Sequence, residues 1–209
     1  MSSQNATARQ PQRERGRLRV AALMDAAIAL FSEQGFEATT MTAIAARAGA
    51  SIGSLYQFFP TKEHMADALL TDHAEALFQR MQALVAESAT WPLAAVAGNV
   101  FPALMQFRAD YPAFGVLLET PRGPVLQATG VRQRMRGYVT EILRPHASHL
   151  SAAELETVAV IVLQTMKTAV ALNAETDLPQ RNLVLDQLRD MLTLWLTRKL
   201  VGTPPADDR

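Results

Sequence analysis

The chain has 209 residues, a formal net charge of zero and no cysteine. The absence of cysteine excludes disulfides, thiolate nucleophiles and thiolate metal sites. Apolar residues make up 49% of the sequence, which supplies enough material for a core and excludes a disordered chain. We find no apolar run of the roughly 18 residues that a membrane span requires and no signal peptide, and we therefore expect a soluble, cytoplasmic protein.

The charge is unevenly distributed along the chain. Residues 1–62 hold seven basic and four acidic residues, a net charge of +3, whereas the remaining residues hold 13 basic and 16 acidic ones, a net charge of −3. A basic N-terminal third favours a DNA-binding head joined to a body with another role. We expect residues 1–16 to form a flexible basic arm that neutralises phosphates; a solvated tail without that role is the alternative.

The first predicted helix runs from about Arg17 to Gln34, with Gly35 at its end. Its apolar residues recur at helical spacing and are expected to pack against the helices that follow: Leu23, Ala27, Leu30 and Phe31.

Two short helices separated by a glycine come next. Thr40 can cap a helix from about Met41 to Ala48, because its hydroxyl accepts a hydrogen bond from an amide that the helix leaves unpaired. Gly49 can adopt the left-handed conformation and turn the chain. Ser51 caps the second helix, which ends before Pro60. This order of cap, helix, turn, cap and helix predicts a helix-turn-helix.

The outer face of this motif carries small, hydroxyl, amide and aromatic side chains and no carboxylate. Such a face can approach phosphates and base edges closely, and the N-terminus of a helix favours anions. Lys62, the first residue of the next helix, is expected to contact a phosphate. The candidate DNA-binding residues are Arg17, Thr40, Thr42, Ser51, Ile52, Gly53, Ser54, Tyr56, Gln57 and Lys62.

At these positions the sequence resembles the TetR (tetracycline-repressor-like) family of bacterial transcription regulators. The resemblance covers roughly residues 17–65, and many members carry an aromatic residue followed by histidine or tyrosine where this chain has Gln57 and Phe58. The matching residues are Thr40, Ile44, Ala45, Ala48, Gly49, Ser51, Gly53, Leu55, Tyr56, Phe59, Thr61, Lys62 and Glu63.

The resemblance implies an all-α fold, with an N-terminal three-helix helix-turn-helix head (residues 17–65) and a C-terminal helical ligand-binding and dimerisation domain (residues 66–201). It also implies a ligand-responsive repressor that binds a palindromic double-stranded DNA operator as a dimer and is released by a small-molecule effector. The palindrome follows from the two-fold symmetry of two identical heads.

The helices of the body are marked by their caps. Thr61 is expected to start a long helix that ends near Ser88, and Ser151 with Glu154 forms a capping box that starts a helix to about Asn173. Pro179 is expected in the first turn of a final helix that reaches about Leu200 and is apolar nearly all round. Because such a helix is buried, we expect a homodimer through residues 151–200, followed by a loose tail at 202–209.

Effector contacts are expected among aromatic, methionine and isolated polar residues of the body, because pockets between helices are mostly apolar with a few polar groups. Plain core is the alternative for each of them. The candidates are Phe78, Trp91, Phe101, Met105, Phe114, Tyr138, Gln164 and Lys167.

Catalysis has no support from particular residues. The segment 49–53 matches G-x-S-x-G, but a nucleophile elbow requires a preceding strand, and the segment before it has helical periodicity. His146 and His149 lie in a predicted turn without carboxylates beside them, so neither metal nor cofactor is expected. The chain is expected not to be an enzyme.

The alternative to a regulator is a helical sensor or protein-interaction module whose head binds DNA only non-specifically.

Overall fold

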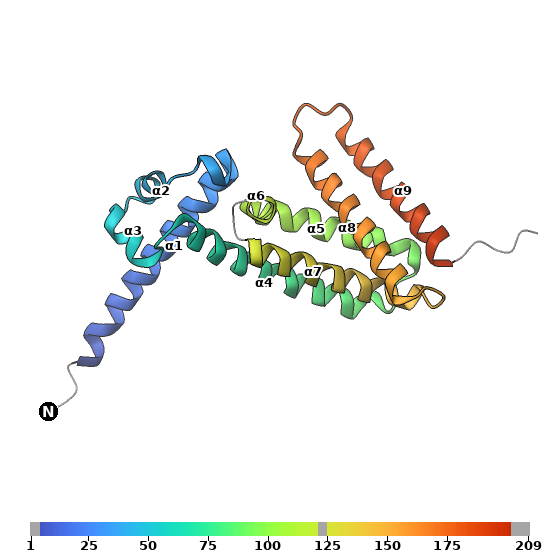
Figure 1. Cartoon of the computed structure of the whole chain (residues 1–209), viewed down its shortest axis with the longest axis horizontal. Helices are drawn as coiled ribbons and strands as arrows, with labels where there is room; N and C mark the ends of the chain where they lie inside the picture. Colours follow the sequence, from blue (N-terminus) through green and yellow to red (C-terminus); the bar gives the residue numbers. More distant parts are fainter. Residues whose placement is uncertain (1–4, 121–124, 202–209) are drawn as a thin grey trace, which may run out of the picture. The chain divides into compact units, whose positions relative to one another are not determined.

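The computed structural model describes residues 5–120 and 125–201, and among these the side chains of 14–120 and 128–201. Throughout the described ranges the regular structure is helical, which confirms the all-α expectation (Figure 1). The expected tail at 202–209 and the first four residues of the expected arm lie outside the described residues. The α-helices are α1 (Asn5–Ala38), α2 (Met41–Arg47), α3 (Ile52–Phe58), α4 (Lys62–Ser88), α5 (Leu93–Asp110), α6 (Pro112–Glu119), α7 (Val125–Leu143), α8 (Ala152–Ala174) and α9 (Arg181–Val201), with a 3-10 turn at Arg144–His146.

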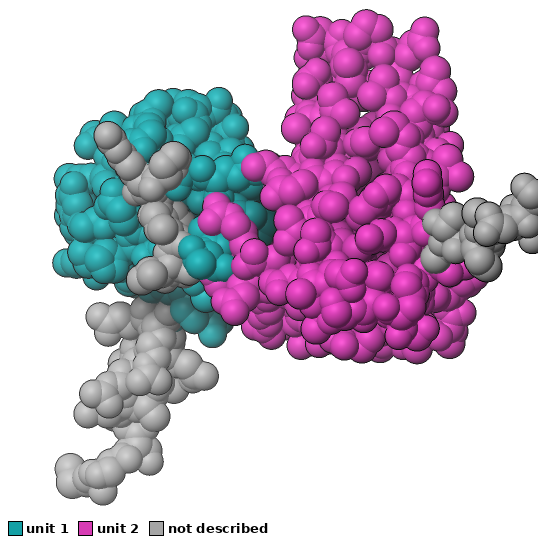
Figure 2. Space-filling model, turned by 45° about the vertical axis from the view of Figure 1, so that its right-hand side comes forward, with its two compact units in different colours: residues 1–74, 111–129 teal, residues 75–110, 130–209 magenta. Residues whose placement is uncertain are grey.

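The chain forms two compact units, coloured separately in Figure 2. Unit 1 comprises residues 1–74 and 111–129, and unit 2 comprises residues 75–110 and 130–209. The chain therefore passes between the units three times, within α4, between α5 and α6, and within α7.

Helix α1 begins earlier than the sequence predicts. We expected a flexible arm up to residue 16, but the backbone is helical from Asn5. This segment is rich in arginine, glutamine and alanine, which have high helix propensity and extend the helix without an apolar stripe. Gly35 interrupts the helix as predicted: its φ of 83° and ψ of 169° lie in a region that only glycine adopts without strain.

Unit 1 contains a helix that we assigned to the body. Helix α6 packs against α1 within this unit, and its Ala113, Phe114 and Leu117 are buried. Its small residues Ala113 and Gly115 are both covered, which is typical of a helix that approaches its neighbour closely. The head therefore has a larger core than the first three helices would supply.

Unit 2 is built around α5, α8 and α9, which pack on one another; α8 and α9 lie side by side in Figure 1. The capping box at Ser151 and Glu154 is confirmed, with the Glu154 carboxylate accepting a hydrogen bond from the Ser151 backbone amide at 2.9 Å. Pro179 lies outside the final helix, because Gln180 has a φ of 50° and the helix starts only at Arg181.

Helix α8 corrects the expectation that no segment is long and apolar enough to cross a membrane. Its length and composition pass that test. A core helix of a soluble protein passes the same test, and α8 buries Leu155, Val158, Val162 and Met166 within unit 2.

His73 is a buried titratable side chain in the core of unit 1. It is 3% exposed, and its ring lies 4.8 Å from the ring of Tyr111, measured between centroids. Its Nδ1 atom has no hydrogen-bond partner within the described residues. Burial lowers the pKa of His73 below its usual 6.5, and the nearby Asp72 carboxylate opposes that shift only in part.

This burial predicts a pH-dependent stability. Since the folded state disfavours the proton, the stabilisation from neutral His73 is complete above pH 6.5 and is lost as the pH falls below that value. We expect His73→Phe, which keeps a ring against Tyr111, to make the free energy of unfolding less dependent on pH below 6.5. Denaturant titrations at a series of pH values measure this, with His64→Gln, an exposed histidine of the same helix, as the control. Equal slopes in wild type and His73→Phe would contradict it.

Candidate nucleic-acid interface and ligand pocket

The predicted helix caps form in the structure. The Thr40 hydroxyl accepts a hydrogen bond from the amide of Ala43 at 3.1 Å, and the Ser51 hydroxyl accepts one from the amide of Ser54 at 3.2 Å. Gly49 has a φ of 62°, the left-handed conformation that the turn requires. Because α2 and α3 have only seven residues each, hydrogen bonds at their ends contribute a larger share of the stability of these helices than they would in long ones.

One side of α2 and α3 is buried and the other faces outward. Ile44, Ala45, Leu55 and Phe59 are buried in unit 1. The outward side groups most of the candidate DNA-binding residues on one surface, with Ser54 partly covered. The exposed residues of this surface are Thr40, Thr42, Ser51, Ile52, Gly53, Tyr56, Gln57 and Phe58.

Exposed arginine residues of α1 add positive charge to unit 1. Arg17 is exposed, as a phosphate contact requires. The Arg19 guanidinium donates to the Ser54 hydroxyl at 3.4 Å and so reaches α3 itself. Arg19 is absent from the predicted set; its position at the end of the run of arginines from Arg9 to Arg19 was the available signal.

Arg47 has a different role. Its two terminal nitrogens donate to the Glu33 carboxylate at 2.5 and 2.7 Å, which ties α2 to α1. The hydrogen bond from Arg47 lowers the pKa of Glu33. The pair is exposed, so its effect is to fix the side chains rather than to stabilise the fold strongly.

Lys62, the expected phosphate contact, has acceptors within the head. Its Nζ atom donates to the backbone carbonyls of Phe36 at 2.7 Å, Thr39 at 2.9 Å and Glu37 at 3.3 Å. It also lies 4.3 Å from the centroid of the Phe36 ring. These acceptors lie more than twenty residues earlier in the chain, so no local sequence pattern could have indicated them.

The candidate effector residues are distributed over both units. Phe78 and Tyr138 lie 5.9 Å apart between ring centroids in unit 2, and the Arg134 guanidinium sits 4.1 Å from the Phe78 ring. Phe101 is buried, Trp91 and Met105 are partly buried, and Phe114 belongs to unit 1. Gln164 and Lys167 are exposed on α8 in the single chain. The buried side of α8 is formed by other residues, among them Leu155, Val158, Val162 and Met166.

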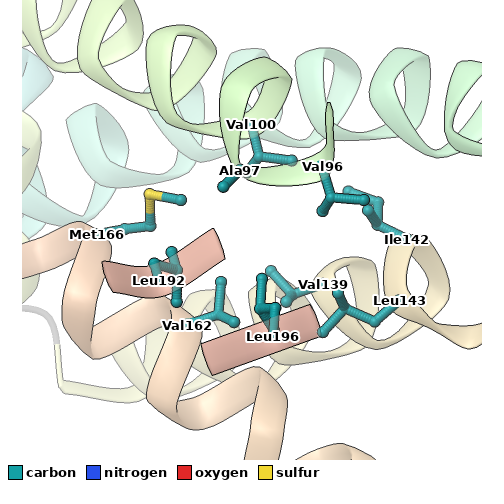
Figure 3. Close-up of a pocket in the computed structure, with 10 residues that line it drawn as sticks. All are labelled: Val96, Ala97, Val100, Val139, Ile142, Leu143, Val162, Met166, Leu192 and Leu196. Carbon is teal, nitrogen blue, oxygen red and sulfur yellow. The ribbon is translucent and has the colours of Figure 1, made fainter. Parts of the chain in front are cut away.

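A small pocket lies elsewhere in unit 2, between α5, α7, α8 and α9. Its cavity volume is about 10 Å³, which is room for about one water molecule, and it is partly open to solvent. Figure 3 shows its side chains pointing toward a common space, and every one of them is aliphatic or a methionine. None belongs to the predicted effector set, because valine and leucine within an apolar helix carry no signal that separates a pocket from a core. The lining residues are Val96, Ala97, Val100, Val139, Ile142, Leu143, Val162, Met166, Leu192 and Leu196.

The two histidines considered as metal ligands have different surroundings. His146 ends the 3-10 turn, and its Nε2 atom is buried without a hydrogen-bond partner among the described residues. A ring nitrogen of His149 lies 3.3 Å from the Lys199 carbonyl oxygen. In the described part of the chain there is no group of three or more metal-ligating side chains.

Comparison with protein families gives two matches that together cover most of the chain. Residues 23–69 match the model described as "Bacterial regulatory proteins, tetR family", and residues 92–196 match "Tetracyclin repressor-like, C-terminal domain".

A curated relative resembles the N-terminal part. The HTH-type transcriptional repressor KstR2 of Mycolicibacterium smegmatis is 40% identical over 76 residues, which is 36% of this chain and 37% of the relative. The match therefore spans little more than a third of that relative's length.

Solved structures share the fold of most of the chain. The ketosteroid transcriptional regulator KstR2 of Mycobacterium tuberculosis has a TM-score of 0.64 at 22% identity, covering 83% of this chain and 92% of that one. The regulator FadR of Bacillus subtilis, solved in complex with stearoyl-CoA, has a TM-score of 0.62 at 15% identity, covering 88% and 100%.

Substitutions at Ser51 separate its capping role from its place on the exposed surface. Ser51→Ala removes the acceptor for the Ser54 amide and is expected to lower the free energy of unfolding by about 1 kcal/mol. Ser51→Asp retains an acceptor at the helix start but adds a negative charge to the surface, so we expect stability close to wild type with weaker DNA binding. Denaturant unfolding and fluorescence anisotropy measure the two effects. Wild-type DNA affinity in Ser51→Asp would remove this residue from the interface.

Proposed function

Since the chain belongs to the TetR family of bacterial regulatory proteins, we propose that it represses transcription by binding a palindromic operator as a homodimer, and that a small molecule bound in unit 2 releases it. The DNA-binding segment is residues 17–65, and the effector and dimerisation segment lies within residues 66–201. A regulator that acts on DNA works in the cytoplasm, and we assign it no catalytic role.

The observation that carries DNA binding is the exposed surface of α2 and α3. It includes the N-terminal end of α3, small residues and hydroxyls, and exposed Tyr56 and Gln57, and the Arg19 guanidinium donates to the Ser54 hydroxyl of α3. Helix-turn-helix proteins place the N-terminal residues of the second helix on base edges in the major groove. The amide of Gln57 suits a base edge, and the arginines suit phosphates.

The proposed dimer surface is the apolar side of α9 that the chain leaves uncovered. Leu192, Leu196 and Leu200 face the core, whereas Met191 and Leu194 are 65% and 72% exposed. A monomer rarely leaves such large apolar side chains grouped in contact with water. A second copy related by two-fold symmetry would cover them, together with the exposed Ile161 of α8.

The proposed effector is apolar. The pocket between α5, α7, α8 and α9 has an aliphatic lining with no polar side chain, and because its cavity volume is only about 10 Å³, the surrounding helices must move apart for a ligand to enter. The similarity to a ketosteroid regulator and to a regulator solved with stearoyl-CoA supports the same chemistry. Release requires that this ligand prefer the conformation that binds DNA weakly, with a coupling of about 1–3 kcal/mol.

Selection of bound sites from a random duplex library tests the function directly. The purified protein at moderate salt is expected to enrich an inverted repeat, with half-sites about one helical turn apart. Binding without any enriched sequence, and lost as salt rises, would instead favour a protein-interaction module with a non-specific basic head.

Substitution of Leu194, which is exposed on α9, tests the proposed dimer. We expect Leu194→Arg, which brings a charge into an apolar interface, to shift the protein from dimer to monomer and to weaken operator binding, because one head alone meets only one half-site. Light scattering gives the mass of each species, and Leu194→Met is the matched control. A dimeric Leu194→Arg protein would place the interface on another surface.

A further inference from the structure

Ile52 places an apolar side chain on the surface that we propose for DNA binding. It is the first residue of α3, and it is 40% exposed. The same helix supplies the core of unit 1 from another side, where Leu55 is fully buried. Because the Ile52 side chain has no polar atom, it can contribute an apolar contact to a partner but no hydrogen bond.

Gly53, the next residue, indicates where a partner approaches α3 most closely. Glycine is less favourable than alanine inside a helix, so its presence there needs a reason. Its φ is not positive, and beyond the backbone of its own helix no atom of the described residues lies within 4 Å of the point that a Cβ would occupy. Since neither backbone conformation nor packing requires this glycine, the space beside it is available to a molecule outside the chain.

The chemistry of the DNA major groove limits what Ile52 can recognise there. Base-pair edges in this groove carry hydrogen-bond donors and acceptors and one apolar group, the C5 methyl of thymine. Helix-turn-helix proteins place the N-terminal residues of their second helix on these edges. Arg19, which donates to the Ser54 hydroxyl of α3, supplies positive charge that complements the phosphates. The thymine methyl is therefore the group in the groove that matches Ile52.

We propose that Ile52 is a specificity-determining residue whose side chain packs on the C5 methyl of one thymine in each half-site, with Gly53 leaving room for that base pair to approach α3. The inference rests on the proposed operator binding and names one base that the operator must contain. It predicts that this thymine is required for its methyl group, separately from the hydrogen bonds that its base pair offers.

Replacement of thymine by deoxyuridine isolates the methyl group, because it leaves base pairing unchanged. In the site enriched from the random duplex library, each thymine is replaced in turn, and affinity is measured by fluorescence anisotropy at one salt concentration. For the wild-type protein we expect one sensitive position, where affinity falls about fourfold with one half-site replaced and about fifteenfold with both.

Variants of exposed apolar residues of α3 assign the contact to a side chain. Ile52→Ala is expected to bind the thymine site with lower affinity and to lose nothing further when deoxyuridine occupies the sensitive position. Ile52→Val keeps a branched side chain and is expected to retain most of the sensitivity. Phe58→Ala is the matched control, because Phe58 is also 40% exposed but lies on another side of the helix, and it is expected to retain the full sensitivity.

Substitution of Gly53 tests the close approach by a separate measurement. The Cβ of Gly53→Ala has space in the folded chain, so we expect its midpoint of denaturant unfolding to equal or exceed that of wild type. Operator affinity is nevertheless expected to fall, because the added methyl occupies space that the base pair needs. Unchanged operator affinity in Gly53→Ala would contradict the close approach.

The proposal fails if no thymine of the enriched half-site is sensitive to deoxyuridine. It is also overturned if Ile52→Ala remains as sensitive as wild type, because the methyl would then contact another residue such as Tyr56. An enriched inverted repeat with either result would leave operator binding in place and remove only the role of Ile52. A library that yields no enriched site would remove the proposed function and this inference together.

Discussion

The DNA-binding head depends on satisfying the backbone groups at the ends of very short helices. Helices of seven residues, such as α2 and α3, are unstable alone, because their intrahelical hydrogen bonds are few compared with the unpaired groups at their ends. Thr40 and Ser51 satisfy the starts of these helices, and Lys62 satisfies the end of α1. Packing of Ile44 and Leu55 then fixes how the capped helices meet.

These contacts also decide which basic side chains are paired within the head and which remain exposed. Arg47 is used in an ion pair with Glu33, and Lys62 donates to backbone carbonyls. Arg17 stays exposed, and Arg19 reaches the recognition helix through Ser54. Counting basic residues along the sequence therefore overstates how many are available to phosphates, because some are already paired within the fold.

Two apolar features of unit 2 point to different partners. The pocket is concave and lined from four helices, which suits a small ligand, whereas the uncovered side of α9 is a row of large side chains on one helix, which suits another protein surface. Helix α9 contributes Leu192 and Leu196 to the pocket and Met191 and Leu194 to its uncovered side. Because both features share this helix, a ligand that shifts α9 would also change the surface that we propose for the dimer.

The sequence by itself determined the helices, the caps at Thr40, Ser51 and Ser151, the glycine turn and the family resemblance, because each depends on residues within a few positions of one another. Only the tertiary structure decided that α6 packs with the head, that Gln164 and Lys167 are exposed in the single chain, and that Lys62 meets carbonyls more than twenty residues away. The buried side of an apolar helix is selected by its neighbours, and the partner of a flexible cation is selected by which acceptors the folded chain brings within its reach. Neither is encoded in local spacing.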